Sequence, residues 1–72
     1  MGIKVRLAVV LAQREMKLKE LEEKTGLSLN NLSVLKTGKA KAVRFSTLIL
    51  LCEALDCQPG DLFEYIKDEE EK

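Results

Sequence analysis

The strongest structural signal lies in residues 17–37, which read KLKELEEKTGLSLNNLSVLKT. Residues 17–25 are rich in Lys, Glu and Leu, which favour a helix, and Gly26 supplies a C-terminal stop. Ser28 stands where the N-cap of a second helix belongs, and that helix is expected to end at Thr37. Two short helices joined by a glycine-containing turn predict a helix-turn-helix. An ordinary antiparallel helix pair in a bundle is the alternative.

Periodic spacing predicts further helices on both sides of this motif. It places one helical face on residues 5–15 and another on residues 45–56. The residues of these two faces are Leu7, Val10, Leu11, Arg14, Leu48, Leu51, Cys52 and Leu55. Pro59 suits the first position of another helix, whose positive end would favour the Asp61 carboxylate. Residues 1–67 are therefore expected to fold as one mainly helical domain.

The two ends of the chain carry a different pattern. Ile3 and Val5 alternate with polar residues, and so do Phe63 and Tyr65. This alternation allows a short strand at each end, and the two could pair if they pack on the helices. Residues 68–72 contain four acidic residues and no apolar one, so an acidic disordered tail is expected there.

Composition excludes several classes of function. The chain of 72 residues is 46% apolar and lacks His, so it offers no imidazole base and no His metal ligand. Cys52 and Cys57 cannot complete a four-ligand zinc site; on a continued helix they would point to different faces. We expect reduced thiols near the core rather than a redox pair, which indicates a cytoplasmic protein. Its longest apolar run has six residues, too short to span a membrane. No enzyme, cofactor, metal or small-molecule ligand is predicted.

The zero net charge conceals an uneven distribution. Residues 1–44 hold ten basic and four acidic residues, whereas residues 45–72 hold two basic and eight acidic ones. Residues 36–44 contain four basic residues and no acidic one. Such a concentration can neutralise phosphates even in a protein without net charge. A merely solvated loop is the alternative.

The string LEEKTGLSLNNLSVLKTGKAKAVRFSTLILLCEALDCQPGDLFEY, residues 21–65, resembles the small Cro/repressor-type helix-turn-helix regulators, the xenobiotic-response-element family. Its ending LCEALDCQPGDLFEY, residues 51–65, is similar to that of short stand-alone members, and the likeness covers residues 7–66. The resemblance implies an all-α, compact five-helix lambda-repressor-like domain without a ligand domain. It also implies transcription regulation through sequence-specific binding of double-stranded DNA by the third helix, commonly as a homodimer.

The resemblance further assigns roles to individual residues. Base edges in the major groove are expected to be read by Leu29, Asn30, Asn31, Ser33 and Val34. Backbone phosphates are expected to be held by Lys17, Ser28, Lys36, Thr37, Lys39, Lys41 and Arg44. Because an asparagine amide can bond adenine through two hydrogen bonds, Asn30 or Asn31 would carry sequence information.

The chain departs from the family pattern at several positions. Glu22 replaces a small residue, so either the helix crossing differs or Glu22 turns outward; Lys36 replaces a Glu that often pairs with an Arg of the first helix. Apolar side chains stand at Leu18, Leu29 and Val34, where polar readers are frequent. These leucines and the valine favour an alternative function, a protein-interaction module such as an antitoxin-like or adaptor subunit. A continuous apolar patch of these three side chains would favour a protein partner, whereas their isolation among Lys and Asn side chains would favour DNA.

An apolar surplus marks the predicted helix 45–56. Ile49 and Leu50 widen its apolar stripe beyond what a core face needs. Such a surplus on a small domain predicts burial against a partner, and we expect a homodimer interface there. Cover by the fifth helix or the terminal strands is the alternative.

Overall fold

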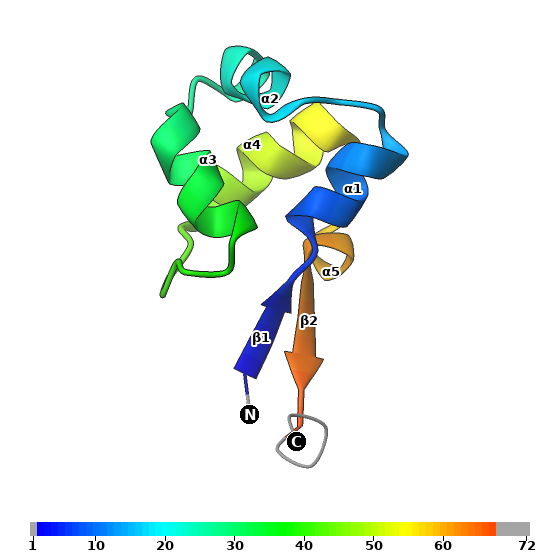
Figure 1. The fold of residues 1–72 in the computed structure, drawn as a ribbon, viewed down its shortest axis with the longest axis vertical. Helices are drawn as coiled ribbons and strands as arrows, with labels where there is room; N and C mark the ends of the chain where they lie inside the picture. Colours follow the sequence, from blue (N-terminus) through cyan, green and yellow to red (C-terminus); the bar gives the residue numbers. More distant parts are fainter. Residues whose placement is uncertain (1, 68–72) are drawn as a thin grey trace.

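The computed structural model describes residues 2–67, which form five helices and one two-stranded antiparallel sheet (Figure 1). The elements in chain order are β1 (Gly2–Val5), α1 (Leu7–Gln13), α2 (Leu18–Thr25), α3 (Leu29–Lys36), α4 (Phe45–Leu55), α5 (Pro59–Leu62) and β2 (Phe63–Ile66). The five predicted helices and the terminal β-pair are confirmed. The predicted acidic tail, residues 68–72, lies outside the described residues.

The core consists entirely of leucine and valine side chains drawn from all five helices. Its buried members are Leu7, Val10, Leu11, Leu21, Leu32, Leu35, Leu51, Leu55 and Leu62. The helix α2 packs against both α3 and α4, and α1 contacts α3 and α5 (Figure 1). Of the face predicted for residues 45–56, Leu51 and Leu55 are buried, whereas Leu48 and Cys52 are half-buried at its margin. Because helices this short are marginal alone, this shared core holds the helix-turn-helix in place.

The strands β1 and β2 pair with each other and extend away from the helices (Figure 1). The register runs from Gly2 opposite Ile66 to Val5 opposite Phe63. The Arg6 backbone N–H donates to the Leu62 carbonyl at 2.7 Å, and so β1 is tied to the end of α5. Val5 therefore belongs to the sheet, and the helix expected within residues 5–15 begins at Leu7.

Two helix termini follow the capping and stop signals predicted from the sequence, and a third has an unexpected conformation. Gly26 closes α2 with φ of 77°, a left-handed conformation in which glycine has no steric cost. Pro59 opens α5, and the Asp61 carboxylate accepts a hydrogen bond of 2.9 Å from the Gln58 backbone N–H. At the end of α4 a non-glycine residue, Asp56, takes the left-handed conformation with φ of 50°.

The turn at Asp56 corrects the expectation for the two cysteines. Because α4 ends at Leu55, the chain folds back and the Cys57 N–H donates to the Cys52 carbonyl at 3.1 Å. Both thiols are free, half-buried and packed against the core, as predicted. Because α4 does not continue through Cys57, the helical spacing from which different faces were predicted does not apply to the two cysteines.

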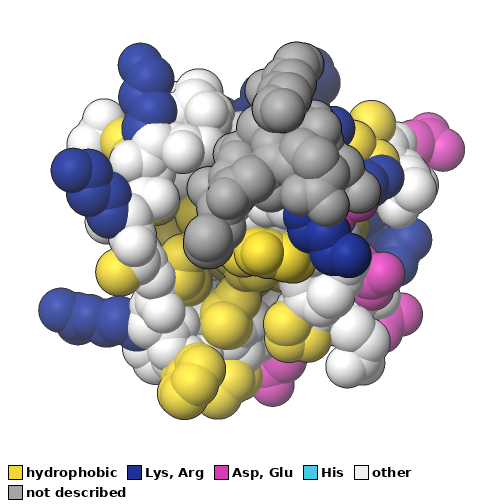
Figure 2. Space-filling model, turned by 90° about the horizontal axis from the view of Figure 1, so that it is seen from below, with side chains coloured by type: hydrophobic (Ala, Val, Ile, Leu, Met, Phe, Trp, Pro, Cys, Tyr) yellow, Lys and Arg dark blue, Asp and Glu magenta, His cyan; other side chains and the backbone are white. Residues whose placement is uncertain are grey.

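A hollow separates the sheet from the loop after α3. Its lining is mostly apolar and includes Val5, Leu48 and Phe63. Figure 2 shows the molecule from this end, with hydrophobic side chains gathered centrally and Lys and Arg side chains projecting at the margins. Among residues 2–67, no helix has the length and apolar character needed to cross a membrane.

Candidate nucleic-acid interface

The helices α2 and α3 form the predicted helix-turn-helix. Leu21 of α2 and Leu32 of α3 are fully buried in the shared core. The Thr25 hydroxyl closes the turn because it donates to the Leu21 carbonyl at 2.7 Å and accepts from the Leu27 N–H at 3.1 Å. With Gly26 in the left-handed conformation, these bonds fix the direction in which α3 leaves the turn.

Two side chains cap the start of α3. The Ser28 hydroxyl accepts a hydrogen bond of 3.1 Å from the Asn31 N–H, which confirms its predicted place as N-cap. The Glu22 carboxylate accepts a bond of 2.8 Å from the Leu29 N–H. A carboxylate at this end is favoured by the helix dipole as well as by the bond itself. Glu22 is half-buried and reaches toward α3. The sequence led us to expect that Glu22 either alters the helix crossing or turns outward. That expectation did not include its capping role.

The residues predicted to read bases lie along the first two turns of α3 but divide between two hollows. Asn30 and Asn31 are exposed, Leu29 and Val34 are 42% and 38% exposed, and Ser33 is half-buried. The first hollow lies between α3 and the first turn of α2, and its lining is Leu18, Lys19, Leu29, Asn30 and Ser33. The second lies between α3, the following loop and α4, and its lining includes Asn31, Val34, Ala40, Arg44 and Thr47.

This division bears on the alternative function as a protein-interaction module. Leu18 and Leu29 share the first hollow with Lys19, Asn30 and Ser33, while Val34 lines the second. Leu18 and Leu29 therefore lie together, and Val34 borders a different hollow. By the criterion set from the sequence, the polar neighbours Lys19 and Asn30 favour DNA, whereas the pairing of the two leucines does not.

The residues predicted to hold phosphates surround α3 and are exposed. Lys17 is the N-cap of α2, and Lys36 lies in the last turn of α3. Thr37 caps the end of α3, and its hydroxyl donates to the Val34 carbonyl at 3.0 Å. The others at the surface are Ser28, Lys39, Lys41 and Arg44. Basic side chains thus lie on α2, at the end of α3 and in the next loop.

Arg14 has a partner that the sequence did not reveal. Its guanidinium donates to the Leu55 carbonyl at 2.7 Å and to the Asp56 carbonyl at 2.9 Å. A cation is favoured at this end of α4, where the carbonyls lack helical partners. Arg14 therefore holds α1 to the end of α4. The position of Lys36 often carries a Glu that pairs with an Arg of the first helix, and here Arg14 binds these two carbonyls instead.

Helix α4 presents an apolar surface to solvent. Ile49 is 59% exposed and Leu50 is 36% exposed, so within residues 2–67 neither α5 nor the sheet covers them fully. Phe45, one turn before Ile49, is 82% exposed. Sequence reasoning missed Phe45, although its four-residue spacing from Ile49 was a usable signal.

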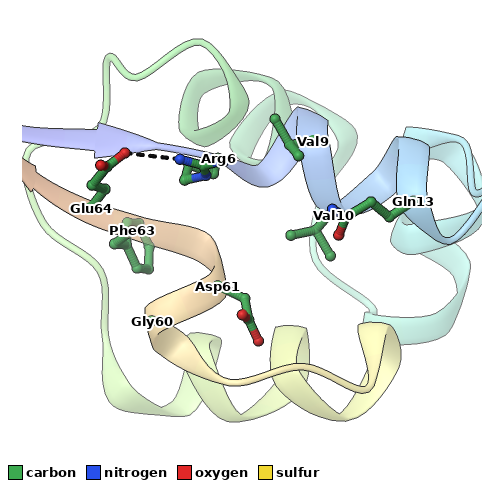
Figure 3. A pocket seen from close by; sticks show the side chains of 8 residues that line it. All are labelled: Arg6, Val9, Val10, Gln13, Gly60, Asp61, Phe63 and Glu64. Carbon is green, nitrogen blue, oxygen red and sulfur yellow. Dashed lines mark hydrogen bonds and ion pairs between the residues drawn. The ribbon is translucent and has the colours of Figure 1, made fainter.

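Another hollow lies beside α1, α5 and the sheet (Figure 3). The Arg6 guanidinium and the Glu64 carboxylate pair at 2.9 Å on the side of the hollow next to the sheet, and Val9, Gln13 and Asp61 also line it. Its lining contains none of the residues predicted to contact DNA. Within the described residues, no three acidic or Cys side chains come together as a metal site would require.

The sequence model of the Cro/C1-type HTH DNA-binding domain matches residues 6–68. The chain belongs to this family. An HTH-type transcriptional regulator of Bacillus subtilis strain 168, YozG, is 53% identical over 70 residues, which are 97% of this chain and 83% of YozG. The crystal structure of the transcriptional regulator VanUg superposes with a TM-score of 0.72 at 34% identity, covering 94% of this chain and 92% of that one.

Membership of the Cro/C1-type family confirms the resemblance seen in residues 21–65. The chain is an HTH-type DNA-binding transcriptional regulator, and the family is not one of enzymes. The solved relative matches 94% of this chain, and the family model matches residues 6–68. The Cro/C1-type domain accordingly spans almost the whole chain.

Proposed function

We propose that this regulator inserts α3 into the major groove and reads base edges with residues of its first two turns. The observation that carries the proposal is the exposure of Asn30 and Asn31 in the first turn of a helix-turn-helix. The start of such a helix is the part that reaches base edges most directly. The proposed readers are Leu29, Asn30, Asn31, Ser33 and Val34.

Phosphate contacts would orient the domain on the duplex. The proposed contacts are Lys17, Ser28, Lys36, Thr37, Lys39, Lys41 and Arg44. All of these residues are exposed around α3, which supports this role. Their contribution would be independent of sequence and would weaken as salt rises, since binding releases condensed counterions.

The regulator acts as a homodimer in this proposal, through Ile49 and Leu50 on α4. Their exposure, together with that of Phe45, leaves an apolar surface that a second copy could cover. A symmetric dimer would place two recognition helices about 34–36 Å apart, one turn of the duplex, and would select a near-palindromic site. Occupancy of such an operator would either block or recruit polymerase.

We place this activity in the cytoplasm. The sequence has only two cysteines, Cys52 and Cys57, and they lack the CxxC spacing of a redox pair, which is typical of proteins whose thiols stay reduced.

Selection of bound sequences from a random duplex pool at two salt concentrations tests the proposal. We expect a near-palindromic sequence to be enriched at both, with tighter binding at low salt. Base contacts would preserve the preference as phosphate attraction is screened. Failure to retain any duplex at low salt would contradict DNA binding by this chain, whereas retention without enrichment would contradict base reading by α3.

A further inference from the structure

The hollow between α2 and α3 is lined by both apolar and polar side chains. Leu18 and Leu29 supply the apolar part, and Lys19, Asn30 and Ser33 complete the lining. Leu29 and Ser33 are one helical turn apart on α3, while Leu18 opens α2. The hollow therefore lies where the first turns of both helices of the motif meet.

The two leucines are held in place by different means. Leu18 is half-buried and packs against the core, so its position is tied to the body of the domain. Leu29 is 42% exposed, but its backbone N–H is anchored by the Glu22 carboxylate at 2.8 Å. The capping bond therefore fixes the backbone position from which the Leu29 side chain projects into the hollow.

The occupant must offer a small apolar group next to hydrogen-bonding groups and negative charge. Among the base edges of the major groove, the thymine 5-methyl is the apolar group, and alkyl side chains contact it there. Asn30, which also lines the hollow, matches the donor and acceptor of adenine, and Lys19 matches a phosphate. A duplex containing thymine offers all three within one groove.

We propose that the Leu18–Leu29 hollow receives the 5-methyl group of one thymine in each half-site and makes Leu29 a specificity-determining residue. The inference rests on the proposed entry of α3 into the major groove. In this proposal Leu18 and Leu29, the apolar residues that depart from the family pattern, take part in DNA recognition. A protein segment in the same hollow is the competing occupant, and the test separates the two.

The test replaces each thymine of the selected duplex, one at a time, by 2′-deoxyuridine. This change removes the 5-methyl and leaves base pairing and phosphates intact. We expect one thymine per half-site at which it weakens binding about fourfold, the equivalent of about 0.8 kcal/mol for one buried methylene-sized group. Leu29→Ala should weaken binding to the thymine duplex and abolish the difference between thymine and deoxyuridine at that position.

Val34→Ala is the matched control, since Val34 is similarly exposed on α3 but lines the other hollow. It should retain the difference at the position that Leu29 governs. A selected site without thymine, a scan without any sensitive thymine, or a Leu29→Ala variant that keeps full sensitivity would overturn the inference and leave base reading by α3 standing. If the wild-type chain binds no duplex, the proposed function falls, and the inference with it.

Discussion

The Glu22 carboxylate of α2 accepts a 2.8 Å hydrogen bond from the Leu29 backbone N–H, the first of α3. The side chain of one helix of the motif thereby caps the other. It satisfies a donor that the helix cannot satisfy itself and brings negative charge to the positive end of α3. The position of the proposed reading helix depends in part on this contact.

Removing the cap should destabilise the domain. Glu22→Ala is expected to lower the free energy of unfolding by about 0.5–2 kcal/mol, the usual cost of losing an N-terminal cap. Glu22→Gln keeps an acceptor oxygen and should cost less. Urea denaturation measures both, with Glu23→Ala as control because Glu23 is exposed on the same helix. Equal stability of Glu22→Ala and the control would show that the bond contributes nothing.

The loop after α3 should contribute electrostatic affinity. Changing Lys39 and Lys41 to Ala is expected to weaken binding to all sequences similarly and to flatten the plot of log K against log salt by about 0.9 for each lost contact. Titration of one duplex over a series of salt concentrations measures the slope. Lys4→Ala removes an exposed charge from β1 and should leave the slope unchanged. A wild-type slope in the double variant would mean that the two lysines are only solvated.

Asn30 should carry base preference without contributing to stability. It is exposed in the first turn of α3, and alanine has the better helix propensity, so Asn30→Ala should unfold like wild type. The variant is expected to lose about 1–3 kcal/mol of discrimination at one position per half-site, while its salt slope stays the same. Competition binding with single-base variants of the selected duplex measures this, and Asn31→Ala should lose less. Undiminished selectivity in Asn30→Ala would refute base reading by this residue.

The apolar surface of α4 should govern assembly. Ile49→Glu/Leu50→Glu is expected to shift the protein from dimer to monomer, because two carboxylates would be buried against a partner. Sedimentation at high micromolar concentration measures the change. Val9→Glu alters a comparably exposed apolar residue on α1 and should remain dimeric. Wild type that sediments as a folded monomer would contradict the dimer.

The Cys57 thiol should make stability fall at alkaline pH. Burial raises its pKa above the ordinary value of 9.0, and the neighbouring Cys52 and Asp61 raise it further. The unfolded chain therefore loses this proton at a lower pH than the folded chain does. The free energy of unfolding should decrease as pH rises from 9.0 toward the folded pKa. Urea denaturation below and above pH 9.0 measures the decrease, which should be smaller in Cys57→Ala; an identical decrease would argue against Cys57 as its source.

Local signals were sufficient to predict the helices and the motif. Gly26 stops α2, Ser28 caps α3 and Pro59 opens α5, each through a backbone preference that acts within a few residues. The core positions of α3 and α4 followed from spacing alone, because a buried stripe must repeat with the helical period. The HTH resemblance rests on the same local signals and is therefore visible in the sequence.

Contacts between distant residues could not be predicted in this way. Arg14 meets the carbonyls of Leu55 and Asp56, 41 and 42 positions away, and nothing in its neighbouring sequence indicates them. The Cys57 N–H reaches the Cys52 carbonyl because Asp56 takes a left-handed conformation, which helical spacing does not foresee. The terminal strands could be suspected from alternation, but their pairing depends on where α1 and α5 leave the two ends.

The proposed DNA interface likewise has features that the sequence predicted and features that it did not. Exposed polar residues at the start of α3 were predictable, since a capped amphipathic helix must turn one face to solvent. The division of that face into two hollows, with Leu18 beside Leu29 and Val34 apart from them, depends on how α2 crosses α3. Backbone preferences are encoded within a few residues, whereas the neighbours of a side chain are set by packing across the whole core.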